Sequence, residues 1–169
     1  MSTKTYQKEF RVSVEREVES DRVISELWHS DDGKLDRDGD LPAFRKIEAA
    51  DGREWEILEW YRDGKCHRDE RPAKIVTDLT TGVVVQEIFM RDDLTHRDGD
   101  EKPAFVSRHR DTGKPLEIAF FTDGVEDRAT GPAVMRFDMK SGKLKIAEYW
   151  RRGRRFDPKP SSDTDEPVP

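Results

Sequence analysis

Short runs rich in aliphatic and aromatic residues alternate with turn-forming sequences along most of the chain. The runs end at dipeptides such as Asp63-Gly64, Thr81-Gly82 and Ser141-Gly142. Glycine accepts the positive φ that a tight turn requires, so these dipeptides favour antiparallel hairpins. The pattern predicts β-strands at residues 10–14, 54–62, 73–79, 83–90, 104–110, 115–121, 133–139 and 144–150.

Several markers recur in one register. Pro-Ala dipeptides lie 30, 31 and 29 residues apart, at Pro42-Ala43, Pro72-Ala73, Pro103-Ala104 and Pro132-Ala133. A glycine follows each proline after ten residues, at Gly52, Gly82, Gly113 and Gly142. An aromatic or bulky pair precedes each turn, at Leu27-Trp28, Trp60-Tyr61, Phe89-Met90, Phe120-Phe121 and Tyr149-Trp150. Independent markers at one period indicate an internal repeat.

Each repeat unit is predicted to contain two strands and two turns. The expected fold is all-β: an elongated, twisted, single antiparallel sheet of about ten strands, built from β-hairpin repeats of roughly 30 residues. We divide the chain into an N-terminal capping segment (1–21), the hairpin-repeat domain (22–156) and a disordered, acidic, Pro-rich tail (157–169).

The segment 14–27 has two interpretations. Val14, Val18, Val23 and Leu27 could line one face of a helix, whereas residues 22–28 align with the first strand of the later units. The repeat register favours the strand.

The motifs EWYRDGKCHRDERPA, LWHSDDGKLDRDGDLPA and FFTDGVEDRATGPA resemble bacterial MORN-variant repeats. The resemblance covers residues 24–156 and implies β-hairpins laid side by side in a twisted antiparallel sheet. Some proteins of that group are antitoxin components, and MORN proteins more widely act as membrane-apposition or scaffolding modules. The chain departs from the glycine-dense MORN consensus, and its repeat is longer.

Composition supports a thin fold. Only 33% of the residues are hydrophobic and 40% are charged, which leaves few apolar side chains for a thick core. Four Trp, three Tyr and eight Phe spread along the chain argue against disorder throughout. A fold that orders many residues while burying few is a single sheet or a short-range repeat.

Net charge, apolar run length and cysteine content restrict the classes of partner and the cellular location that we expect. Lys and Arg number 31 and Asp and Glu 37, a net charge of -6 with interspersed signs, so no general attraction to nucleic acid or anionic lipid is expected. No apolar run approaches the roughly 20 residues that span a bilayer, and the first twenty residues lack the hydrophobic block of a secretion signal. A single cysteine, Cys66, fits a reducing compartment. We expect a cytoplasmic protein without nucleic-acid or membrane partners.

No familiar catalytic or metal-binding arrangement appears. The histidines are His29, His67, His96 and His109. They lack the converging spacing of a zinc site, and His67 and His96 occupy places that Asp36 and Asp127 occupy in other units. Nucleophile-elbow, Walker and dinucleotide motifs are missing from the sequence. The sequence therefore predicts no catalytic residue, no metal and no cofactor, and a protein that is not an enzyme.

A repeated arginine precedes each Pro-Ala dipeptide, at Arg37, Arg68, Arg97 and Arg128. The structural interpretation is that each guanidinium pairs with an acid of the neighbouring hairpin or stacks on the preceding aromatic pair. The alternative is a row of arginines that contacts a ligand.

Aromatic pairs and a C-terminal arginine cluster are the candidate partner-binding residues. They are Trp60, Tyr61, Phe120, Phe121, Tyr149, Trp150, Arg151, Arg152, Arg154 and Arg155. Consecutive strand residues face opposite sides, so the pairs place aromatic rings on both faces, and an exposed aromatic row marks an interaction surface. We expect a non-catalytic protein-binding module, such as a bacterial antitoxin or immunity-type partner. The alternatives are a scaffold or membrane-surface module and an enzyme with its site in a groove of the sheet. The expected partner is another protein, such as a toxin or effector, and the chain could also form a homodimer.

Overall fold

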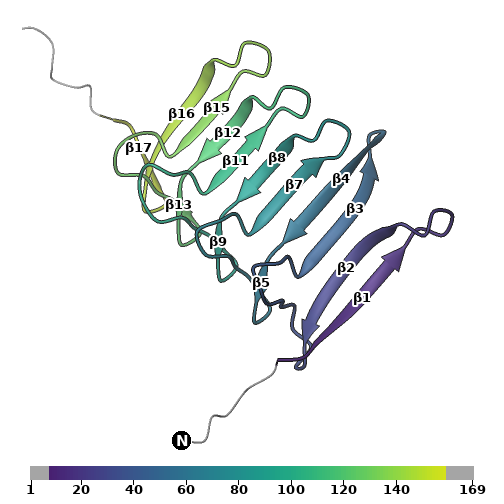
Figure 1. Cartoon of the computed structure of the whole chain (residues 1–169). Coiled ribbons are helices and arrows are strands. Elements are labelled where there is room, and N and C mark those ends of the chain that lie inside the picture. The colour runs from purple at the N-terminus through teal and green to yellow at the C-terminus, as the bar shows by residue number, and fades with distance from the viewer. Residues whose placement is uncertain (1–7, 159–169) are drawn as a thin grey trace, which may run out of the picture.

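The structure, a computed structural model, describes residues 8–158. Within this range the chain forms strands and turns without any helix, and an 11-stranded antiparallel sheet dominates the molecule (Figure 1). The sheet does not close into a barrel, because β1 forms one edge and the β16–β17 pair forms the other. The predicted all-β fold with one antiparallel sheet of paired hairpins is confirmed.

The main sheet has the order β1-β2-β3-β4-β7-β8-β11-β12-β15-β16-β17, so its strands neighbour one another in the order of the sequence. Its strands are β1 (Phe10–Arg16), β2 (Val23–Ser30), β3 (Phe44–Ala50), β4 (Arg53–Glu59), β7 (Lys74–Asp78), β8 (Val84–Ile88), β11 (Phe105–Arg108), β12 (Pro115–Ala119), β15 (Val134–Phe137), β16 (Leu144–Arg151) and β17 (Arg154–Phe156).

Short two-stranded hairpins form a second row beside the main sheet. They are β5 (Tyr61–Arg62) with β6 (Lys65–Cys66), β9 (Met90–Arg91) with β10 (Leu94–Thr95), and β13 (Phe121–Thr122) with β14 (Val125–Glu126). In Figure 1 the labels β5, β9, β13 and β17 follow one another along one end of the long strands.

The second row corrects one expectation, because residues 54–62, 83–90 and 115–121 are each interrupted rather than continuous strands. The break at Trp60 shows the cause. The register pairs Glu59 with Lys74, and the Trp60 N–H donates to the Ala73 carbonyl at 2.8 Å. The Trp60 carbonyl accepts instead from the His67 N–H at 2.9 Å and the Ala73 N–H donates to Ile88, so the β4–β7 ladder ends there and the chain turns into β5.

The N-terminal segment is a strand pair rather than a helix. β1 pairs with β2 over its whole length, with Val12 opposite Trp28 and Val14 opposite Glu26. The strand predicted for residues 22–28 is therefore confirmed, and the helical interpretation of residues 14–27 is wrong. Most of the predicted disordered tail (157–169) lies outside the described residues.

Most of the buried apolar residues lie where the main sheet meets the row of hairpins. The alanines of the four Pro-Ala dipeptides are fully buried, at Ala43, Ala73, Ala104 and Ala133. Trp60, Cys66 and Phe120 are buried beside them. By contrast, every residue of β4 and β8 is only partly buried, which is the expected result for a sheet that forms a single layer.

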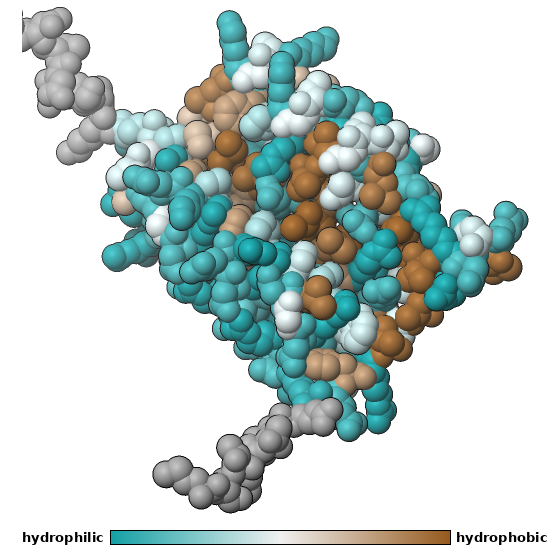
Figure 2. All heavy atoms as spheres, viewed as in Figure 1, coloured by the Kyte–Doolittle hydropathy of each residue, from teal (hydrophilic) through white to brown (hydrophobic). Residues whose placement is uncertain are grey.

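Apolar side chains on the main sheet remain partly exposed. One row across the sheet follows directly from the strand register and is apolar except for Glu87: Leu58, Ile75, Glu87, Val106, Ile118, Met135 and Ala147. Figure 2 shows hydrophobic residues gathered over the long strands and hydrophilic residues over the row of short hairpins. The two parts of the molecule thus present chemically different surfaces.

Candidate functional site

The turn of each short hairpin docks on the hairpin before it. The backbone N–H of the first turn residue donates to a side chain at one repeated position: Asp63 to Asp36, Asp92 to His67, Asp123 to His96 and Arg152 to Asp127, at 3.0–3.3 Å. Aspartate and histidine are interchangeable here because a carboxylate oxygen and an imidazole nitrogen both offer a lone pair. The sequence shows that these residues are equivalent, but their role as acceptors is visible only in the structure.

The repeated arginines form a ladder with the aromatic residues. Each guanidinium lies over the first ring of the preceding pair: Arg37 over Trp28 (3.9 Å), Arg68 over Trp60 (3.8 Å), Arg97 over Phe89 (3.6 Å) and Arg128 over Phe120 (3.8 Å). Each Nη1 also donates to the carbonyl of the following proline, at Pro42, Pro72, Pro103 and Pro132, at 3.0–3.2 Å. Stacking and this hydrogen bond together fix the orientation of every guanidinium.

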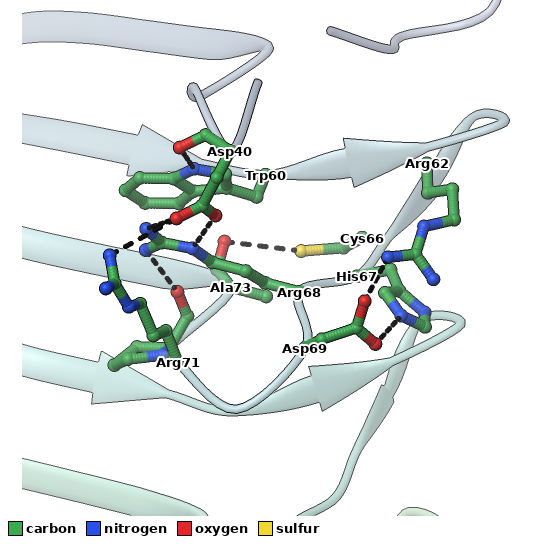
Figure 3. Close-up of polar contacts among 10 residues, drawn as sticks. Asp40, Trp60, Arg62, Cys66, His67, Arg68, Asp69, Arg71 and Ala73 are labelled. Carbon is green, nitrogen blue, oxygen red and sulfur yellow. Dashed lines mark hydrogen bonds and ion pairs between the residues drawn. The ribbon is translucent and has the colours of Figure 1, made fainter. Parts of the chain in front are cut away.

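A loop acid from one unit reaches the arginine of the next unit in the first half of the ladder (Figure 3). Asp40 accepts from Arg68 Nε at 2.6 Å and from Arg68 Nη2 at 2.9 Å, and Arg71 adds a bond at 3.2 Å. The Arg68 guanidinium holds the pKa of the Asp40 carboxyl below its usual value. Arg68 thus makes the two-point contact that suits a planar guanidinium and a carboxylate.

The second and third units repeat a histidine–aspartate–arginine cluster on the same surface. His67 Nε2 lies 3.1 Å from Asp69, which also pairs with Arg62 (Figure 3). In the next unit, His96 Nε2 lies 2.9 Å from Asp98, which pairs with Arg91. Their hydrogen bonds hold the pKa values of the two aspartates below their usual value: Asp69 bonds chiefly to Arg62, and Asp98 chiefly to His96.

Cys66 belongs to the buried junction and not to this surface. Its Sγ donates to the Ala73 carbonyl at 3.7 Å, and burial raises its pKa to about 12. A thiol with that pKa is almost wholly protonated at neutral pH, so it is a poor nucleophile there.

The structure separates the aromatic residues that the sequence grouped as partner-binding candidates. Trp60 and Phe120 have exposed fractions of 7% and 4%, because each lies beneath the arginine of its own unit. Tyr61 and Phe121 follow them in the short hairpins and are half-buried. In this structure Trp60 and Phe120 therefore offer no open ring to a partner.

The remaining candidates lie together at the C-terminal edge. Tyr149 occupies the ladder position, and its ring pairs edge-to-face with that of Phe156, with the ring centroids 6.0 Å apart. Trp150, which follows Tyr149 in β16, is half-buried. The arginines Arg151, Arg152, Arg154 and Arg155 follow in β16, the turn and β17, and all of them are exposed.

Two grooves lie on the surface formed by the hairpins and the Arg-to-Pro loops. One, of about 460 Å³, lies between the first and second units and contains the Asp40–Arg68 pair. The other, of about 640 Å³, lies between the second and third units. It is lined by the histidine and aspartate of both clusters and by Phe89, Arg97 and Lys102. Among residues 8–158, no group of three or more His, Cys, Asp or Glu side chains is placed to hold a metal ion.

Comparisons with protein-family models, with curated proteins and with solved structures found no match to this chain. The part of the chain that the structure describes contains no helix long and apolar enough to cross a membrane.

Proposed function

We propose that the chain is a non-catalytic protein-binding module, of the antitoxin or immunity type that the repeat motifs resemble, and that its partner docks at the C-terminal edge of the sheet. One observation carries the proposal. Residues 144–148 of β16 pair with β15 on one side, and no strand within residues 8–158 pairs with them on the other.

This open edge presents apolar side chains as well as free backbone groups. Leu144 and Ile146 are 52% and 39% exposed. An unpaired strand edge with exposed apolar residues is a template for strand addition by another chain.

The arginine cluster makes the C-terminal edge of the sheet positively charged. Arg152 and Arg154 are exposed, and neither side chain forms an ion pair among the described residues. A cationic border beside an apolar strip favours an acidic protein partner, because complementary charge accelerates association.

The experiment uses the product of the neighbouring gene, purified separately, and measures its affinity for the full chain by calorimetry. Ile146→Lys and the double variant Arg152→Glu/Arg154→Glu should each weaken binding at least about tenfold, since a central anchor or a charge match is lost. Val12→Lys is the matched control, because Val12 is 45% exposed on the opposite edge strand, β1.

Equal weakening by all three variants, or by the β1 control alone, would place the partner elsewhere. Concentration-dependent self-association that Ile146→Lys abolishes would replace the proposed partner with a second copy of this chain. Flotation of the full chain with anionic lipid vesicles would instead favour a membrane-surface module.

A further inference from the structure

The arginine ladder presents the same guanidinium edge in every unit. Arg68 and Arg97 each stack on an aromatic ring and each donate Nη1 to the carbonyl of the following proline, at 3.2 and 3.0 Å. The stacked face and the Nη1 hydrogen bond fix the orientation of both guanidinium groups. The side of each group that carries Nε and Nη2 therefore points in the same direction relative to its own unit.

Oxygen atoms of the preceding loop fill this edge in the second and fourth units. Arg68 receives both carboxylate oxygens of Asp40. Arg128 Nε donates to the backbone carbonyl of Asp100 at 3.0 Å, and the Asp100 carboxylate accepts the Ala129 N–H at 2.6 Å.

In the third unit the same edge has no acceptor. Among residues 8–158, the Arg97 guanidinium donates to Pro103 alone and forms no ion pair. Burial lowers the pKa of Arg97 from its ordinary value, although the nearby charge of Glu87, which pairs with Arg108, acts in the opposite direction.

Loop length explains this alternation. The arginine-to-proline separation is five and six residues in the first and third units, but four in the second and fourth. The longer loops of the first and third units contain Asp40 and Asp100, and their length lets these residues reach the arginine of the following unit. The loop of the second unit, which ends at Pro72, is shorter, and its acid Glu70 forms no hydrogen bond or ion pair with another described residue.

The groove at this open position has room and charge for a ligand. Its volume is about 640 Å³, and Phe89, Met90, Arg97 and Lys102 line it. Asp69 and Asp98 also line it, but each is already paired with an arginine and a histidine. Within the described part of the chain, Arg97 and Lys102 therefore face one unpaired carboxylate, that of Glu70.

We propose that Arg97, in the groove between the second and third units, binds an acidic side chain carried on a loop of a partner protein, in the way that Arg68 binds Asp40. Asp40 defines the ligand: an aspartate on a tight loop, in two-point contact with Nε and Nη2, beside a stacked aromatic ring. Lys102 would add a second cation. The inference does not depend on the β16 edge.

The test uses the chain's own loop as the probe. A blocked synthetic peptide with the sequence of residues 35–43, LDRDGDLPA, is titrated into the full chain labelled with ¹⁵N, and the arginine Nε–Hε signals are followed by NMR. The Arg97 signal should shift and saturate, while that of Arg68 stays in place because Asp40 already occupies its edge.

Matched variants test the chemistry. A peptide with asparagine in place of its last aspartate should bind at least about fivefold more weakly, because the charge-assisted contact is lost. Glu70→Gln should strengthen binding by removing the competing carboxylate, and Lys102→Gln should weaken it. Both residues lie on the loop surface, so these variants test the proposal even if Arg97→Lys fails to fold.

Arg37 is the internal control, since as the first arginine of the ladder it has no preceding unit to fill its edge. Equal shifts at Arg37 and Arg97 would mean adventitious anion binding at any open arginine and would overturn the proposal. Tighter binding of inorganic phosphate than of the peptide would also overturn it, in favour of a phosphate site. Loss of peptide binding in Ile146→Lys would place the contact at the β16 edge instead.

Discussion

Asp40 and Arg68 lie 28 residues apart in successive repeat units and form a two-point ion pair, with oxygen–nitrogen distances of 2.6 and 2.9 Å. The arginine side chain is 10% exposed and stacks on Trp60, whereas the aspartate side chain is 50% exposed. The pair therefore links neighbouring units at the border between the buried junction and solvent. Its counterpart one unit later, Arg97, keeps the stacking contact without the carboxylate.

Replacing Arg68 with lysine should lower the melting temperature. Lysine cannot make the two-point contact with Asp40 or stack as a planar group, and we expect a loss of about 1 kcal/mol in the free energy of unfolding. Urea denaturation of Arg68→Lys, Asp40→Asn and the double variant measures the coupling. Arg97→Lys is the control and should show a smaller loss, and additive effects of the first two substitutions would show that the pair contributes nothing.

Enlarging a junction alanine should destabilise the fold. Ala73 is completely buried, and its carbonyl and N–H both pair with neighbouring strands, so Ala73→Leu must displace packed atoms at a cost of about 1–3 kcal/mol. Ala49→Leu, at an exposed position of β3, should change stability by about 0.5 kcal/mol or less. Similar urea midpoints for the two variants would contradict the placement of the core at the junction.

Acid should weaken the fold through the loop carboxylates. Hydrogen bonds from neighbouring arginine and histidine side chains hold the pKa values of Asp40, Asp69 and Asp98 below their ordinary value in the folded state. A carboxyl with a depressed folded-state pKa stabilises the protein above its unfolded-state pKa, near 4, and this contribution disappears as the pH falls through the folded-state value. The urea midpoint should therefore be steady from pH 7 to about 5 and fall below about pH 4.

The matched variant for the acid experiment is Asp40→Asn, which removes one of the titrating carboxyls. Its stability should be lower than that of the parent at pH 6 and closer to it at pH 3. A constant difference between the two proteins at all pH values would show that the Asp40 carboxyl has the same pKa in both states.

Cys66 should resist alkylation until the protein unfolds. With burial raising its pKa to about 12, the thiolate fraction at pH 8 is at least about a hundredfold below that of an ordinary cysteine. Iodoacetamide labelling followed by mass spectrometry should be slow in buffer and fast in concentrated urea. Rapid labelling of the folded protein would place the thiol on the surface.

The repeat register predicted the sheet well, because the Pro-Ala, arginine and glycine markers determine which runs pair. It did not predict the breaks at Trp60 and its equivalents. A run such as residues 54–62 is continuous in hydrophobicity, and it is interrupted where the Trp60 carbonyl accepts from His67 and not from the opposite strand. The hydrophobic pattern of the run does not reveal this change, because the residue that supplies the new partner lies outside the run.

The candidate site, with its arginine ladder, could be predicted less fully from the sequence than the sheet. Stacking of the repeated arginines on aromatic rings was one of two interpretations, and the open edge at Arg97 follows from loop lengths whose reach depends on the sheet geometry. For Trp60 and Phe120 the sequence favoured an exposed contact surface that the structure does not have. Aromatic residues in a polar chain suggest a contact surface, yet these rings are covered by side chains that the repeat itself supplies.

The docking of each turn on the preceding hairpin has a consequence for biosynthesis. The hydrogen bonds that dock each turn, such as Asp63 N–H to Asp36 and Asp123 N–H to His96, span 25 to 27 residues and join the turn to the unit on its N-terminal side. A nascent chain therefore needs only one further repeat outside the ribosome to add the next hairpin to a template that is already folded. Elongation by such local steps keeps loop-closure costs low, and the growing sheet exposes only one incomplete edge at a time.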